Sequence, residues 1–363
     1  MQVPNDAFFY YLWTTCLTTE NYPAMKPRIC LTILAFAFIV PATEANAQLM
    51  PDSTVQITAY WQKGDQMTYD YRSTECLVED GDTVRLRSYS DIRTIEVIDA
   101  TPTRYTLRIS NHRHFEQDPI AQMIYGLEQR EGLNVPLIIE TSLDGELLCV
   151  VNAAQIVEAA HKLSDRAAET LYDSLPDPVR RTTPQWEWQN IIEKWINPDA
   201  STTRTIEDIG RIFFFHGTRF RPDTEYERHE SLRLPMTDAE ADCVTTFWAD
   251  GATTDAASAM LHTHSVSQAE EALRTTAAAH PEALLLGGAI TPEQAPDTKV
   301  EMESFSGEEI HFASGWPLQA YWSTRLTASP PDGRRILIRV RKQLTRRDSD
   351  APLTSEAETP PLL

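Results

Sequence analysis

Two pairs of histidines in this chain have a spacing that suits metal binding. His112 and His114 form one His-x-His pair, and His262 and His264 form the other. Residues two apart on a β-strand point to the same face, so each pair can present two imidazoles to one metal ion such as zinc. No third ligand stands at a diagnostic spacing, so the alternative is a polar strand face. These four histidines are the metal-ligand candidates, and we predict no cofactor.

The tryptophans are a second group of candidates, because exported glycan-binding proteins stack sugars on exposed aromatic rings. Trp188 and Trp195 fall on the apolar face of a predicted helix, where core packing explains them. Trp316 lies in the turn Gly315-Trp316-Pro317, and turns are usually at the surface. We therefore expect Trp316 to be exposed, and we take it as the ligand candidate.

Motifs for known catalytic chemistry are missing from the sequence. It has no Gly-x-Ser-x-Gly, no His-Glu-x-x-His and no Ser-x-x-Lys with its supporting motifs. Gly287-Gly288 alone cannot cradle a phosphate. Pairs such as Glu301 and Glu303 arise by chance in a chain with 53 Asp and Glu residues, and so do not indicate glycosidase carboxylates. The sequence favours a protein that is not an enzyme.

Residues 25–47 have the pattern of a signal peptide. Met25-Lys26-Pro27-Arg28 is a short basic start, residues 29–40 are apolar, and Ala45-Asn46-Ala47 is a small-x-small cleavage site. The apolar run is shorter than the roughly 20 residues that span a bilayer. We expect cleavage before Gln48 and export to the periplasm or cell surface, with no stable transmembrane span in the mature chain.

Residues 1–24 do not belong to that signal, since they contain no Lys or Arg. We interpret them as upstream sequence translated from a wrongly assigned start. The alternative is a cytoplasmic leader, with residues 29–40 acting as an anchor.

Charge and cysteine content narrow the possible partners. The chain has 32 Lys and Arg residues against 53 Asp and Glu residues, a net charge of −21. Such a surface repels phosphate backbones, so we predict no nucleic-acid partner. Cys76, Cys149 and Cys243 remain after cleavage. An oxidising compartment permits one disulfide among them, but small buried thiols are the better interpretation.

The order of predicted elements is strands, helices, strands. A strand meander covers residues 54–151, a helical block 152–217 and a second meander 224–344, followed by a disordered tail over 345–363. Asp-Gly turns at Asp80-Gly81, Asp144-Gly145 and Asp250-Gly251 indicate hairpins, which require antiparallel pairing. The prediction is one α+β domain over 48–344, a curled, half-barrel-like antiparallel sheet with a central block of helices.

Some finer features are also predicted. Residues 84–89 and 93–98 are expected to form separate strands, as are 299–305 and 308–313, with Ser306-Gly307 between the second pair. Capping boxes are expected at Asn152 with Gln155 and at Ser267 with Glu270. A helix is expected over 203–216.

Three segments resemble uncharacterised exported proteins of Bacteroidetes-type bacteria. They are 60–71, with its Lys-Gly-Asp turn and Tyr-x-Tyr strand; 137–152, a strand, Asp-Gly turn, strand and Asn before a helix; and 312–326, with Gly-Trp-Pro-Leu. The resemblance implies a curled antiparallel half-barrel similar to periplasmic lipid and lipoprotein carriers. It transfers no catalytic residues.

Three functional hypotheses follow from these patterns. The first is a noncatalytic envelope protein that uses the curved sheet to bind an apolar small molecule or lipid, or an envelope protein. The second is a structural or interaction module with no ligand cavity. The third is a hydrolase with an unrecognised site, which would hold several ionisable groups with shifted pKa values in a cleft.

Overall fold

The computed structural model describes residue 50 and residues 54–114, 119–182, 184–196, 198–222, 224–237, 239–250, 257–281 and 285–347. The predicted leader (1–24), the predicted signal peptide (25–47) and all but the first three residues of the predicted tail (345–363) lie outside the described residues. Thr345 and Arg346 belong to the last strand, which therefore runs beyond the predicted end of the domain at residue 344.

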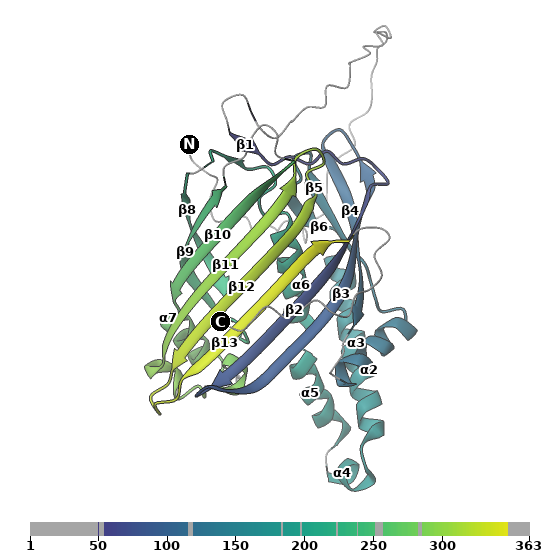
Figure 1. Cartoon of the computed structure of the whole chain (residues 1–363). Coiled ribbons are helices and arrows are strands. Elements are labelled where there is room, and N and C mark those ends of the chain that lie inside the picture. The colour runs from purple at the N-terminus through teal and green to yellow at the C-terminus, as the bar shows by residue number, and fades with distance from the viewer. Residues whose placement is uncertain are drawn as a thin grey trace, which may run out of the picture.

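One curled antiparallel sheet of 11 strands dominates the molecule (Figure 1). Its order is β6-β5-β4-β3-β2-β13-β12-β11-β10-β9-β8, so the two meanders meet where β2 pairs with β13. β6 and β8 are the two edges, and the curl does not close. The strands are β2 (Gln66–Glu79), β3 (Asp82–Ala100), β4 (Arg104–His114), β5 (Leu137–Ser142), β6 (Leu147–Val150), β8 (Tyr226–Arg233), β9 (Glu240–Ala249), β10 (Ser258–Gln268), β11 (Lys299–His311), β12 (Pro317–Ser329) and β13 (Ile336–Arg346).

The helices lie mainly between the two meanders, as the sequence predicts. They are α2 (Pro119–Arg130), α3 (Ala153–Ser174), α4 (Asp177–Thr182), α5 (Gln185–Ile196), α6 (Pro198–Ile212) and α7 (Glu270–Ala279), with the 3₁₀ turns η1 (Leu286–Gly288) and η2 (Ala295–Asp297). A two-stranded sheet joins β1 (Val55–Gln56) to β7 (Arg219–Phe220). Figure 1 shows α2, α3 and α5 projecting beyond the sheet, with α4 at the far end.

Helix α6 lies within the curl, where its polar residues bond to the middle of the sheet and to edge strand β8. Asp208 of α6 accepts hydrogen bonds from Lys342 Nζ on β13 at 2.5 Å and from the Tyr71 hydroxyl on β2 at 3.2 Å. Its neighbour Glu207 forms an ion pair with Arg233 on edge strand β8 at 3.1 Å. The apolar side of α6 packs with residues of β4, β5 and β6 in one buried cluster. The helix therefore covers part of the concave face that a ligand would otherwise reach.

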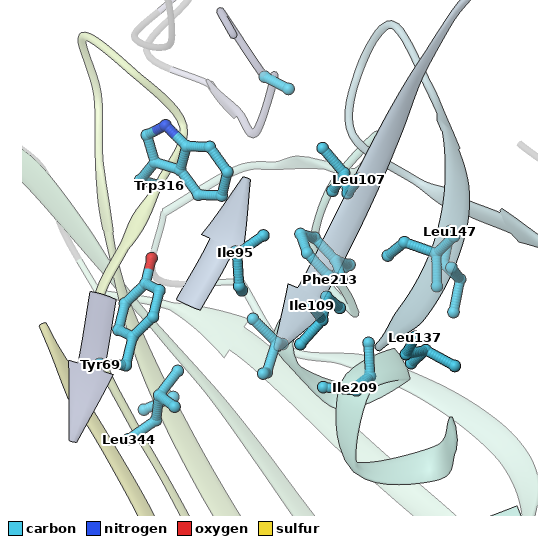
Figure 2. Close-up of a cluster of buried hydrophobic side chains, with 14 of the residues drawn as sticks. Tyr69, Ile95, Leu107, Ile109, Leu137, Leu147, Ile209, Phe213, Trp316 and Leu344 are labelled. Atoms are coloured by element: carbon cyan, nitrogen blue, oxygen red, sulfur yellow. The ribbon is translucent and has the colours of Figure 1, made fainter. Parts of the chain in front are cut away.

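Alternating burial along the strands creates the core. Inward residues of β2, β3 and β4 stand at every second position, and three of them, Tyr69, Ile95 and Ile109, are at most 1 % exposed. Figure 2 shows these side chains converging with Ile209 of α6 and Phe213 of the turn that follows α6. A second cluster joins α7, η1 and η2 to β11, β12 and β13. A third joins β1 and β7 to β9, β10 and β11.

Several predicted breaks are absent, because sheet pairing continues through them. Residues 84–89 and 93–98 form one strand, β3, and residues 299–305 and 308–311 form one strand, β11. Gly307 lies inside β11 opposite Tyr321 rather than in a turn. The helix predicted over 203–216 instead starts at Pro198 and ends at Ile212. Within the predicted helical block, residues 177–182 form the short separate helix α4.

Both predicted capping boxes are wrong. The Asn152 side chain accepts a hydrogen bond from the Ile138 amide and donates one to the Pro136 carbonyl, so it secures the start of β5 instead of α3. Ser267 lies in β10 and donates its hydroxyl proton to the Asp242 carbonyl. In both places the side chain forms hydrogen bonds with another segment of the fold, although local spacing predicted that it would bond to the helix amides.

The three cysteines are free thiols in the structure: Cys76 and Cys149 are half-buried and Cys243 is buried. Among the helices described, none combines the length and apolar character that crossing a bilayer requires.

Candidate functional site

A pocket of about 400 Å³ lies on the outer face of the sheet. It runs across strands β9 to β13, which are separated by four strand spacings of about 4.8 Å each, so it is an elongated groove. We call it the outer-face pocket. Its lining residues are Trp248, His264, Glu303, Phe305, Ser323, Arg325, Arg339 and Arg341.

Strand register brings these side chains together from distant parts of the sequence. His264 is opposite Phe305, Phe305 is opposite Ser323, and Ser323 is opposite Arg341. One step along, Glu303 is opposite Arg325 and Arg325 is opposite Arg339. Cross-strand partners point to the same face, and that face is opposite the one carrying buried Leu326 and Ile338. The pocket is therefore built on the convex side of the curl.

Aromatic rings form one end of the outer-face pocket. The Trp248 and His262 ring centroids are 5.1 Å apart at an interplanar angle of 25°, and the His262 and Phe305 centroids are 5.9 Å apart at 27°. Tyr321 continues the row, 5.8 Å from Phe305. A Cβ atom at Gly307 would lie 2.4 Å from the Tyr321 ring, so only glycine there allows this ring its place. Of this row, Trp248 and Phe305 line the pocket and can offer ring faces to a ligand.

Three guanidinium groups form the other end. Arg325, Arg339 and Arg341 have no side-chain hydrogen bond or ion pair with any residue in the described ranges. Several other arginines in or beside the sheet have acidic partners: Arg93 with Asp91, Arg104 with Glu140, Arg108 with Glu96, Arg233 with Glu207, and Arg334 with Glu79. The one acidic lining residue, Glu303, accepts its hydrogen bond from His264 at 3.0 Å. Positive charge is thus concentrated in one place on a chain whose net charge is −21.

Three of the four candidate histidines have side chains in the described part of the chain, and each of these has its own polar partner. His262 Nε2 lies 3.1 Å from Asp250 Oδ2, whereas His264 Nε2 lies 3.0 Å from Glu303 Oε1. The two imidazoles share the outer face, as the spacing predicts, but each is paired with a different carboxylate. His112 Nδ1 lies 3.2 Å from the Tyr125 hydroxyl, and the side chain of His114 is outside the described part. The described residues contain no group of three His, Cys, Asp or Glu side chains that could hold a metal ion.

The expectation that Trp316 is exposed is wrong. Its side chain is 1 % exposed, and its ring stacks on Trp61 with centroids 4.4 Å apart and an interplanar angle of 23°. In Figure 2 the Tyr69 hydroxyl points toward the same indole. The turn that carries Trp316 folds over the end of the core cluster, because the long strands on either side bring it back against residues 59–61. A surface ligand cannot stack on this ring in the folded protein.

A second polar site lies inside the curl, around Glu308. Its side chain is 3 % exposed, and its Oε1 has no hydrogen-bond partner among the described residues. Burial raises the pKa of Glu308 well above the ordinary glutamate value. The buried Tyr69 hydroxyl and the His216 Nδ1 atom also lack partners in the described part. Burial lowers the pKa of His216 to about 4, although the Gly315 carbonyl, 2.7 Å from its Nε2, acts in the opposite direction.

Replacing Glu308 with glutamine is expected to change how stability depends on pH. Above its ordinary pKa the unfolded carboxyl loses its proton while the folded one keeps it, so folding becomes less favourable as pH rises toward the raised folded value. The slope is up to about 1.4 kcal/mol per pH unit. Glu308→Gln removes this effect, and its stability relative to wild type should increase as pH rises above about 5 toward neutrality. Urea denaturation of both proteins across that range measures the difference.

His216 provides the internal control for that experiment. Its lowered pKa destabilises the fold as pH falls below the ordinary histidine value, but it does so equally in both proteins and cancels in their difference. A stability difference between Glu308→Gln and wild type that stays constant with pH would show that Glu308 is ionised in the fold.

Sequence reasoning missed the three pocket arginines. Arg339 and Arg341 are spaced two apart on a predicted strand, which is enough to place them on one face. Nothing local shows that Arg325 and the aromatic row stand beside them, since that depends on the register of five strands. Trp248 was not among the ligand candidates for the same reason.

Comparison with known proteins gives no family. No family model matches the chain, and no curated protein matches it. One solved structure that matches concerns lipid–protein interactions in lipovitellin; the two are 12 % identical, with a TM-score of 0.36. The match covers 82 % of this chain and 26 % of that one, so this chain spans about a quarter of its length. A likeness at that TM-score carries no argument about function.

Proposed function

We propose that this protein is an exported, noncatalytic binding protein and that the outer-face pocket holds its ligand. The observation behind this is the pocket itself: an open groove with a row of aromatic rings at one end and uncommitted cations at the other. Its aromatic end suits the apolar ligand that the sequence hypothesis expected. The location differs, because α6 and the apolar clusters occupy much of the concave face.

The shifted titratable groups favour binding over catalysis. Glu308, His216 and Tyr69 are buried within the curl, and none of them lines the outer-face pocket. A hydrolytic site needs such groups where a substrate can reach them. The outer-face pocket instead combines an aromatic stacking surface with charged groups, and these features are typical of ligand binding.

Replacing Trp248 with alanine tests the aromatic end. The neutral apolar dye N-phenyl-1-naphthylamine is the probe, and its fluorescence increases on entering an apolar site. Loss of one aromatic contact of about 1.4 kcal/mol should weaken its binding roughly tenfold in Trp248→Ala. Trp186→Ala is the matched control, because Trp186 is 64 % exposed on α5 and outside the pocket. Equal dye binding by both variants and wild type would contradict the proposal.

Export is proposed from the sequence of residues 25–47. The expected result is an extracytoplasmic protein whose intact mass begins at Gln48. Recovery of native material with residues 29–40 still attached would contradict export by a cleaved signal.

A further inference from the structure

The like charges of Arg325 and Arg339 face each other across two strands, and this repulsion destabilises the protein when no ligand is bound. They are direct cross-strand partners on β12 and β13, where side chains stand about 5 Å apart at Cβ. Like charges in directly opposite positions destabilise a sheet. Arg341 adds a third cation two residues along β13, on the same face. Glu303 lies opposite Arg325 on β11, and among the described residues its carboxylate accepts a hydrogen bond from His264 and forms no ion pair with any of the three arginines.

The charges that face this cluster can be named from the register. The neighbour of Arg325 on β11 is Glu303. The neighbours of Arg339 and Arg341 on β2 are Cys76 and Thr74, respectively. Ser323, opposite Arg341, adds a hydroxyl donor. The site therefore presents three guanidiniums and one hydroxyl beside two carboxylates on the same face of β11, those of Glu303 and, one step further along, Glu301. Its net charge is positive in a protein that is strongly acidic overall.

We infer that this cluster binds a tetrahedral phosphate-type oxyanion carried on an apolar or aromatic group, an inference that rests on the proposed function of the pocket. Guanidinium groups pair with phosphate oxygens through two parallel hydrogen bonds, and several can share one dianion. Phe305 on β11 is two strands, or about 10 Å, from Arg341 on β13. A ligand with a ring on Phe305 and a phosphate between the arginines spans that interval.

The test compares ligands that differ only in charge. Binding of 2-naphthyl phosphate, 2-naphthoate and 2-naphthol to the mature protein is measured by titration calorimetry at low salt. The phosphate is expected to bind at least about tenfold more tightly than the neutral naphthol, and to weaken as salt is added. Arg339→Gln should remove about tenfold of the phosphate affinity and leave naphthol binding unchanged.

Controls separate the site from general charge effects. Arg108→Gln removes one positive charge from the outer face of β4, where Arg108 is paired with Glu96 at 2.7 Å, and should leave phosphate binding unchanged. Arg325→Gln should leave the melting temperature of the unliganded protein unchanged or raised, because it removes a like-charge contact. A marked fall in that temperature would mean that Arg325 has a structural role, and would overturn the inference.

Two further arms identify the source of the oxyanion. Binding of inorganic phosphate as tight as that of naphthyl phosphate assigns the site to the free ion. Binding of phosphatidylcholine vesicles only when they contain phosphatidic acid assigns it to a lipid headgroup. Equal affinity for naphthyl phosphate and naphthol would overturn the inference and leave the proposed binding function intact. Failure of the neutral dye to bind would contradict the proposed function itself.

Discussion

Replacing Asp208 with alanine is expected to lower the free energy of unfolding by about 3–5 kcal/mol. Asp208 is the acidic centre that ties α6 to the middle of the sheet, with Lys342 Nζ at 2.5 Å and the Tyr71 hydroxyl at 3.2 Å. The Asp208 side chain is 12 % exposed and that of Lys342 is 24 % exposed. Without the carboxylate, Lys342 stays in a poorly hydrated place without its partner, and that accounts for the large effect.

The same site predicts an acid-sensitive contribution to stability. Burial on its own raises the pKa of Asp208, but Lys342 and Arg93 outweigh it and hold this pKa below the ordinary aspartate value. A lowered folded pKa stabilises the fold fully above the ordinary carboxyl value of about 4, and this stabilisation is lost as pH falls through the lowered folded value. The stability difference between wild type and Asp208→Ala should therefore shrink as pH falls below about 4, as measured by urea denaturation of both proteins across that range.

A double-variant cycle separates the ion pair from general damage. Asp208→Leu with Lys342→Met removes both charges, and replacing a buried pair by apolar residues is often close to neutral. We expect the double variant to be more stable than Asp208→Ala alone, as measured by urea denaturation at pH 7. If the two single losses simply add, Asp208 and Lys342 do not act as a pair.

The second large effect is expected at Trp316. Truncating a fully buried tryptophan to alanine costs about 3–5 kcal/mol, through lost burial and the cavity left behind. Trp316 is 1 % exposed, and its ring stacks on Trp61. Trp61 in turn lies against Phe213, with centroids 5.8 Å apart. Loss of the indole therefore removes packing from both the β-meander and the segment after α6.

Trp186→Ala is the matched control for that experiment. The same substitution on a 64 % exposed side chain should change stability by no more than about 0.5 kcal/mol. Urea denaturation gives both values, and near-ultraviolet circular dichroism should lose the signal of the Trp61–Trp316 stack only in Trp316→Ala. A small stability loss at Trp316 would mean that this end of the core repacks freely.

Local patterns predicted the elements well where their signals are short-range. Asp144-Gly145 has the positive φ of 91° at glycine that a tight hairpin needs, and it joins β5 to β6 as expected. Within the predicted meander over 54–151, Val55, Ile57, Ala59 and Trp61 alternate with mostly polar residues, and all four are at most 3 % exposed. Only Val55 and Gln56 form a strand, however, because pairing with β7 ends there.

Predictions failed where a distant partner decided the outcome. The capping boxes were local readings of Asn152 and Ser267, and both side chains bond to another segment instead. The break expected at Gly307 disappears because Tyr321 on the neighbouring strand packs against it and the ladder continues. Residue spacing cannot show which carbonyl or ring will be across the sheet.

By itself, the sequence determined the succession of strands, helices and strands, the antiparallel pairing and the acidic surface, because hairpin turns, apolar periodicity and charge are properties of neighbouring residues. Only the tertiary structure decided that Trp316 is buried, that α6 lies inside the curl, and that Trp248, Phe305 and three arginines share one pocket. Those placements depend on the order and register of β9 to β13. A shift of one residue in one strand would turn its pocket side chains into the core.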